Sequence, residues 1–203
     1  MPTPSVRKAT ETDKVLVEGG LGPPELARLG RYRACTQLSL RALAIADLEC
    51  VTRLPALASV ELYATRIDDW GALARCRTLR RLFVNGVKDP ARLAQVSALP
   101  QLTNLGLANL HTLTALPDLA GCRRLTEVLV WNCKRLRDLA PLLRAPRLAR
   151  LRLVATPHTP DELVPLLALP RLKFVSAQFA TVRANQRFAA LLAEHGKRAH
   201  PVG

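Results

Sequence analysis

The stretch Leu125–Arg147, LTEVLVWNCKRLRDLAPLLRAPR, decides the fold. Its first part alternates, so that Val128 and Val130 share one face of a short strand. Its second part places Leu139 and Leu142 three positions apart, a spacing typical of helical or 3-10 turns. The predicted unit is therefore a short strand followed by a helical return.

This unit recurs along the chain as apolar triplets with LxxLxL spacing. The triplets are Cys35-Leu38-Leu40, Leu57-Val60-Leu62, Leu79-Leu82-Val84, Leu102-Leu105-Leu107, Leu125-Val128-Val130, Leu148-Leu151-Leu153 and Leu172-Val175-Ala177. Their first members stand at positions 35, 57, 79, 102, 125, 148 and 172, which is 22 to 24 residues apart. Because periods in this range indicate a repeat architecture, we expect a one-dimensional stack of layers. One more step back predicts an opening strand over 14–18, which would make eight layers.

The returns between strands carry their own repeated positions. One apolar column contains Leu48, Trp70, Leu93, Leu116, Leu139 and Leu163, so Trp70 is predicted to be a core residue. An aspartate precedes most of these segments, at Asp47, Asp69, Asp89, Asp118 and Asp138. Aspartate there can accept hydrogen bonds from free backbone N–H groups. Thr159–Glu162 has the spacing of a capping box.

These residues resemble the leucine-rich-repeat family, in its short 22-residue class of bacterial internalin-type proteins. The resemblance covers roughly residues 15–178. It implies an α/β solenoid: a concave parallel sheet of seven to eight strands, a convex face of short 3-10 or α segments, and a C-terminal capping helix. The position that the family gives to a buried Asn or Cys holds Leu43, Thr65, Val87, Leu110, Cys133 and Thr156. The family's asparagine ladder is therefore expected to be mostly absent.

The predicted organisation is a single repeat domain with short ends. Residues 1–11 are expected to be disordered, 12–178 to form the repeat domain, and 179–203 to form a capping helix (Ala184–His195) and tail. The polar start differs from a secretory signal peptide, and no apolar run approaches the roughly 20 residues of a membrane span. Five cysteines without a CxxC pair favour reduced thiols. These features predict a cytoplasmic protein that does not insert into membranes.

The sequence offers no constellation that favours catalysis. The carboxylates mostly occupy the capping positions, and the four histidines lack metal-ligand spacing. Register predicts that Cys76 and Cys122 are buried, with no histidine in their layers to activate them. No GxxxxGK[ST] phosphate loop occurs. We therefore expect no enzyme, no cofactor, no metal and no small-molecule substrate.

The outward positions of the strands instead predict a binding face. In a parallel stack, side chains of neighbouring layers align about 4.8 Å apart. The candidate partner-binding residues are Tyr63, Arg81, Phe83, Asn85, Glu127, Leu129, Trp131, Arg150 and Arg152. Aromatic anchors flanked by arginine are typical of protein interfaces, and Glu127 is expected to pair with Arg150 or with the partner. The alternatives are that the tail covers some of these aromatics or that their placement is accidental.

A formal net charge of +14 favours a second surface. Arginines precede the strands and would form a basic rim, at Arg31, Arg33, Arg75, Arg77, Arg123, Arg124, Arg144, Arg147 and Arg171. This rim is either a solvated edge that reflects GC-rich coding or a docking site for an acidic protein or nucleic acid. The sequence thus predicts a protein-protein interaction module with an acidic protein partner; the alternative is nucleic-acid or anionic-surface binding through the rim.

Overall fold

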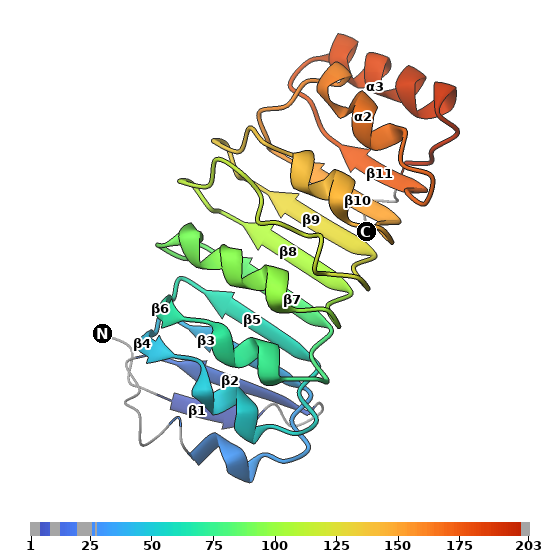
Figure 1. The fold of residues 1–203 in the computed structure, drawn as a ribbon. Coiled ribbons are helices and arrows are strands. Elements are labelled where there is room, and N and C mark those ends of the chain that lie inside the picture. Colours follow the sequence, from blue (N-terminus) through green and yellow to red (C-terminus); the bar gives the residue numbers. More distant parts are fainter. Residues whose placement is uncertain (1–4, 9–12, 20–25, 27, 200–203) are drawn as a thin grey trace.

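The main sheet of the molecule runs through every layer of the stack. The computed structural model describes residues 5–8, 13–19, 26 and 28–199. Nine strands follow one another in the order β1-β2-β3-β5-β7-β8-β9-β10-β11 (Figure 1). Their bounds are β1 Ser5–Lys8, β2 Lys14–Glu18, β3 Gln37–Arg41, β5 Ser59–Tyr63, β7 Arg81–Asn85, β8 Asn104–Ala108, β9 Glu127–Trp131, β10 Arg150–Val154 and β11 Phe174–Ala177.

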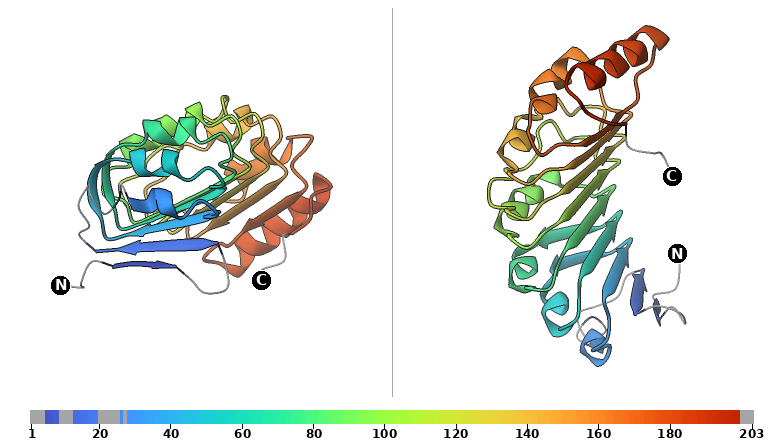
Figure 2. Two further views of the ribbon diagram at one scale, coloured as in Figure 1. Left: turned by 90° about the horizontal axis from the view of Figure 1, so that it is seen from below. Right: turned by 90° about the vertical axis from the view of Figure 1, so that its right-hand side faces the viewer.

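The strands from β2 onward are parallel and in equal register. Inward residues pair with inward residues across layers, as in Leu82 with Leu105 and Leu105 with Val128. Figure 2 shows the sheet on the concave side of the curved stack and the helical turns on the convex side. The predicted eight parallel strands and the solenoid fold are confirmed.

The first strand corrects the expectation that residues 1–11 are disordered. β1 pairs antiparallel with β2, with Val6 opposite Val17. The physical reason is that the outer edge of β2 would otherwise present unpaired backbone groups, and a strand on that edge satisfies them. The rest of the expected disordered segment, 1–4 and 9–11, lies outside the described residues.

The seven layers from β2 to β10 turn out of their strands through a residue in the left-handed region. The positive φ values lie at Gly19, Ala42, Ala64, Gly86, Asn109, Asn132 and Ala155. For the first six of these residues, the backbone N–H donates to the last carbonyl of the next strand, for example Asn109 to Trp131 at 2.9 Å. Left-handed backbone costs a non-glycine residue roughly 1–2 kcal/mol, and here the inter-layer hydrogen bond offsets that cost.

The convex returns are short and mostly 3-10 helical. They comprise η1 Arg28–Arg31, η2 Glu49–Arg53, η3 Gly71–Arg75, η4 Pro90–Ala98, η5 Ala140–Arg144, η6 Asp161–Leu163 and α2 Val164–Leu167. All five predicted aspartates accept a hydrogen bond from the backbone N–H two residues on, as in Asp138 to Ala140 at 2.8 Å. At the capping box, Glu162 accepts from the backbone N–H of Thr159 at 2.6 Å.

A second, two-stranded sheet was not predicted from the sequence. β4 (Ala44–Asp47) and β6 (Arg66–Asp69) pair in parallel, with Ile45 opposite Ile67. They lie where the chain leaves the main sheet (Figure 1). This extra pairing ties the second and third layers together.

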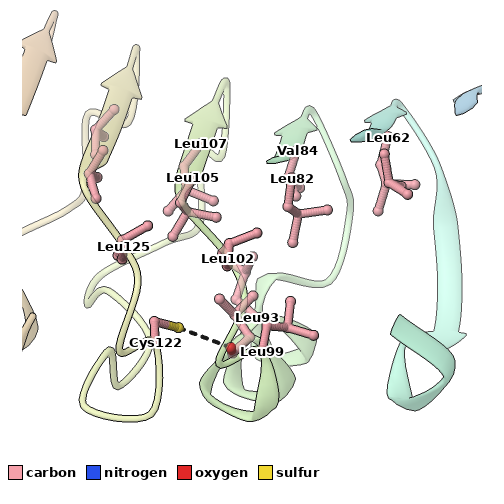
Figure 3. Close-up of a cluster of buried hydrophobic side chains, with 14 of the residues drawn as sticks. Leu62, Leu82, Val84, Leu93, Leu99, Leu102, Leu105, Leu107, Cys122 and Leu125 are labelled. Atoms are coloured by element: carbon pink, nitrogen blue, oxygen red, sulfur yellow. Dashed lines mark hydrogen bonds between the residues drawn. The ribbon is translucent and has the colours of Figure 1, made fainter. Parts of the chain in front are cut away.

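The core is a continuous column of aliphatic side chains between sheet and returns (Figure 3). Leu105 is 1% exposed, and Trp70 is buried as predicted. The Cys122 thiol donates to the Val96 carbonyl of the preceding layer at 3.2 Å. At Gly121 a Cβ would meet the Ser97 carbonyl oxygen at 2.0 Å, so only glycine fits this close approach.

The last layer is covered by α3 (Val182–Glu194), close to the predicted Ala184–His195. Its Thr181 hydroxyl accepts from the Ala184 N–H at 3.1 Å, and the helix ends before Gly196, whose φ is +62°. Phe188 of α3 is buried against Phe179, with ring centroids 5.3 Å apart. The predicted capping helix is confirmed.

Candidate functional site

The aromatic side chains in the first half of the concave face pack against side chains and backbone of neighbouring layers. The Arg41 guanidinium stacks 4.5 Å from the Tyr63 ring centroid, and the Tyr63 and Phe83 centroids are 5.7 Å apart. A Cβ at Gly106 in the next strand would meet Phe83 at 2.4 Å, so the ring occupies the space that this glycine leaves. Tyr63 and Phe83 are therefore half-buried, which corrects their prediction as exposed anchors.

These two aromatic residues border a shallow hollow of about 310 Å³, which Arg81 and Leu129 also line. Burial, and then the nearby Glu61 carboxylate, raise the pKa of the Tyr63 hydroxyl. The phenol thus stays protonated and can donate a hydrogen bond.

The acidic residues of the concave face are held by neighbouring layers. Glu61 pairs with Lys14 at 3.5 Å and accepts from Gln37. Glu127 accepts from the Asn104 amide at 2.9 Å. Arg150 stacks over the Phe174 ring at 5.6 Å, so the expected pairing of Glu127 with Arg150 is wrong. Asn104 and Arg150 both stand directly opposite Glu127, in β8 and β10, and the carboxylate takes the Asn104 amide as its partner while the Arg150 guanidinium lies over Phe174.

A short ladder of asparagines runs along one edge of the concave face. Asn109 donates to Asn85 at 2.9 Å, and Asn132 donates to Asn109 at 2.6 Å. The ladder is displaced to the strand ends, away from the family's usual position. Asn85, a predicted partner-binding residue, is thus half-buried and engaged as an acceptor.

The second half of the concave face is open and apolar. A cavity of about 710 Å³ lies between the sheet and α3. Its walls are Leu129 and Trp131 of β9 and Phe188 and Leu192 of α3, and Arg152 of β10 also lines it. We call this cavity the α3 groove. Trp131 is 47% exposed, so this predicted anchor does face solvent.

The sequence predicted α3 as a cap over the last layer and left open that the tail covers some of the concave aromatics, but it did not predict this groove. The amphipathic spacing of the helix was visible, but the direction in which the helix crosses the sheet is set by packing of Phe188 against Phe179, which has no local sequence signature.

The predicted basic rim separates into two groups. Arg75 and Arg144 end convex 3-10 turns and pair with Glu49 and with Asp118, the latter at 3.5 Å. They are therefore not part of a free rim. Of the remaining arginines, Arg31 and Arg33 are exposed before β3, and Arg31 stacks 4.8 Å from the Tyr32 ring centroid. The other five precede later strands in exposed turns: Arg77, Arg123, Arg124, Arg147 and Arg171. We call these five residues the basic edge.

No acid in the described part of the chain neutralises the basic edge. The four residues before each strand from β5 to β11 contain no carboxylate, and none of the five arginines forms an ion pair within the described residues. On the convex side, by contrast, Arg92 and Arg187 pair with Asp89 and Asp161.

The remaining reactive side chains are isolated. Among the described residues no three His, Cys, Asp or Glu side chains gather as a metal site requires. His158 is buried, its Nδ1 lacks a partner, and burial lowers its pKa.

Across the described part of the chain, no helix combines the length and apolarity that a membrane span needs.

The five cysteines are unpaired, and burial raises the pKa of each thiol. The pKa reaches about 12 for Cys50 and about 11 for Cys122, which makes both poor nucleophiles. Cys122 is buried as predicted. Cys76 is only half-buried, beside a cavity of about 260 Å³, which corrects its predicted burial.

This difference predicts an order of thiol labelling. With iodoacetamide at mildly alkaline pH, Cys76 should react first in the folded protein, because it is partly accessible. Cys50 and Cys122 should react only after unfolding, when their pKa returns to the ordinary 9.0. Mass spectrometry of the labelled peptides checks this order. Rapid native labelling of Cys122 would contradict its place in the core.

No protein-family model matches the sequence, and no curated protein is similar to it by sequence. Among solved structures, internalin C2 of Listeria monocytogenes is similar at 20% identity and a TM-score of 0.46, over 79% of each chain. An internalin (inlF) of the same organism is similar at 16% identity and a TM-score of 0.48, over 88% of this chain and 57% of its own. By its own repeat, parallel register and convex 3-10 turns, the chain has the fold of a leucine-rich-repeat solenoid with repeats of 22 to 24 residues.

Proposed function

We propose that the chain is a non-catalytic module that binds another protein on the concave face of its sheet. Trp131 is the observation that carries this proposal. Three large hydrophobic side chains are exposed among the described residues: Trp131 (47%), Leu143 (42%) and Val182 (74%). Of these, Trp131 lines the α3 groove. An exposed tryptophan beside an apolar hollow has the make-up of an interface hot spot.

The charge of the chain favours an acidic partner. Its net charge is +14, and Arg81, Arg150 and Arg152 stand on the same face as Trp131. Guanidinium groups form bidentate hydrogen bonds with carboxylates, and a net positive field speeds encounter with an acidic surface. The five free thiols support a reducing compartment such as the cytoplasm as the place of this encounter.

Photo-crosslinking in the native cell tests this function. Benzoylphenylalanine placed at Val154, the register neighbour of Trp131, faces the α3 groove. The same residue placed at Leu143 faces the convex side and is the matched control. We expect a protein adduct from position 154 and none from 143. Adducts from 143 alone would overturn the proposal.

A second candidate function is the binding of nucleic acid along the basic edge. The absence of carboxylates from the turns before β5 to β11 favours it, since five unpaired arginines there present a single sign of charge. Phosphate contacts release counterions, so such binding weakens steeply with salt.

Charge reversal distinguishes DNA binding at the basic edge from attraction of DNA by the net positive charge of the whole protein. The triple variant Arg124→Glu, Arg147→Glu, Arg171→Glu should lose affinity for a mixed-sequence DNA oligonucleotide. Its salt slope should also fall, by about 0.9 per lost phosphate contact. Fluorescence anisotropy over a salt series measures both. The convex triple variant Arg92→Glu, Arg144→Glu, Arg187→Glu carries the same charge change. Equal losses in the two variants, or no binding by the parent at low salt, would exclude the basic edge.

A further inference from the structure

We propose that the α3 groove holds a segment of the partner that presents an apolar side chain next to a carboxylate, and that Arg152 binds this carboxylate. The inference rests on the proposed protein-binding function of the concave face. It places that function at the end of the concave face beside α3, and it specifies the side chains that the bound segment presents.

The shape of the groove suits a short segment of chain. Its walls come from β9 and from α3, and Val154 and Ala177 contribute to its lining. The volume of about 710 Å³ lies in the range of roughly 300–1,000 Å³ that is typical of compact ligand sites. A few side chains fill such a volume, whereas the shallow hollow at Phe83 offers only about 310 Å³.

The apolar half of the occupant follows from the lining. Trp131, Leu129, Phe188 and Leu192 face the same space from two elements. An aliphatic or aromatic side chain placed between them would remove apolar surface from water on both sides, at about 25 cal/mol per Å².

The carboxylate follows from the charge of the lining. Arg152 is the one charged side chain among the residues that line the groove, and no carboxylate is among them. Its register neighbours are Leu129 and Ser176, and no ion pair or side-chain hydrogen bond to its guanidinium is formed within the described residues. The side chain is half-buried. A partly desolvated guanidinium without a counter-charge is best stabilised by a bidentate carboxylate.

The other polar residues of the lining, Ser176, Gln178 and Asn185, are uncharged. The Asn185 amide is engaged with the Phe179 and Thr181 carbonyls, at 3.0 and 2.8 Å. Arg150, two residues before Arg152 on β10, lies over the Phe174 ring and outside the groove. An occupant of the groove therefore meets a single cation, in a fixed position on β10.

The test selects short random peptides, displayed on phage, against the full chain in excess polyglutamate and elevated salt, which suppress bulk attraction. We expect selected peptides to carry Asp or Glu beside Leu, Ile or Phe. Arg152→Gln should weaken a selected peptide about tenfold or more, because a charge-assisted hydrogen bond is lost. Replacing the peptide's carboxylate with an amide should weaken binding by the same factor. Combining that peptide with Arg152→Gln should weaken binding no further, because both changes remove the same interaction. Arg183→Gln, the same charge change at an exposed position of α3 outside the groove, should leave binding unchanged.

Several results would overturn this assignment. One is the absence of any selected peptide, and another is selected peptides that bind Arg152→Gln as they bind the parent. Concentration-dependent dimerisation that Trp131→Ala abolishes would make a second copy the occupant. Peptide binding gained on removal of residues 200–203 would make the chain's own end the occupant. If Phe83→Ala removes peptide binding and Arg152→Gln does not, the concave face still binds protein, but elsewhere. Failure of cross-linking from position 154 in cells would remove the underlying function itself.

Discussion

Leu105→Ala is expected to lower the free energy of unfolding by about 2–5 kcal/mol, the range for removing a buried leucine and leaving a cavity. Leu105 is 1% exposed and lies mid-stack, with Leu82 and Val128 as its register neighbours (Figure 3). The cavity would therefore open between two layers at once. Each layer of a solenoid contacts only its neighbours, so the loss should also reduce the cooperativity of unfolding.

Urea unfolding followed by circular dichroism measures this change. The matched control is Leu143→Ala, which removes the same atoms from a side chain that is 42% exposed. It should cost clearly less, since burial sets the size of the penalty. A Leu105→Ala protein as stable as its parent would show that the inward columns are misassigned.

The layers were predictable because the spacing of LxxLxL is itself the physical constraint. A residue such as Leu105 must face inward in every repeat, so its column is visible at a period of 22 to 24 residues. The capping aspartates were predictable for the same reason, since each layer leaves the same free N–H groups at the start of its return.

The turns after the strands were only partly predictable. Asn109 and Asn132 tolerate positive φ and belong to residue types that favour it, whereas Ala42, Ala64 and Ala155 adopt it without any local preference. At Ala42 and Ala64 this conformation is held by the hydrogen bond to the next strand, a contact between layers. The pairing of β4 with β6 arises between layers in the same way.

The candidate site was predicted at the level of the face but not of the contacts. The Phe83 ring packs against Gly106, which leaves room for it in the next layer. Ion pairs also join adjacent layers. Glu49 and Arg75, Asp118 and Arg144, and Asp161 and Arg187 are each 26 residues apart. This constant offset was present in the sequence, and it could have removed Arg75 and Arg144 from the predicted rim.

The claim that protein binding occurs on the concave face is tested most directly by a paired substitution. Trp131→Ala and Leu143→Ala each remove a large side chain of similar exposure, 47% and 42%, from opposite faces of the solenoid. Truncation of a hot-spot tryptophan costs about 2–4 kcal/mol of binding, whereas a residue outside the interface costs almost nothing.

Calorimetric titration of each variant with the partner cross-linked from position 154 gives the two affinities, and thermal unfolding of the free proteins controls for stability. We predict that Trp131→Ala weakens binding by about 2–4 kcal/mol with little loss of stability. Leu143→Ala should bind as the parent does. Unchanged affinity in Trp131→Ala, or an equal loss in both variants, would contradict a binding site on the concave face.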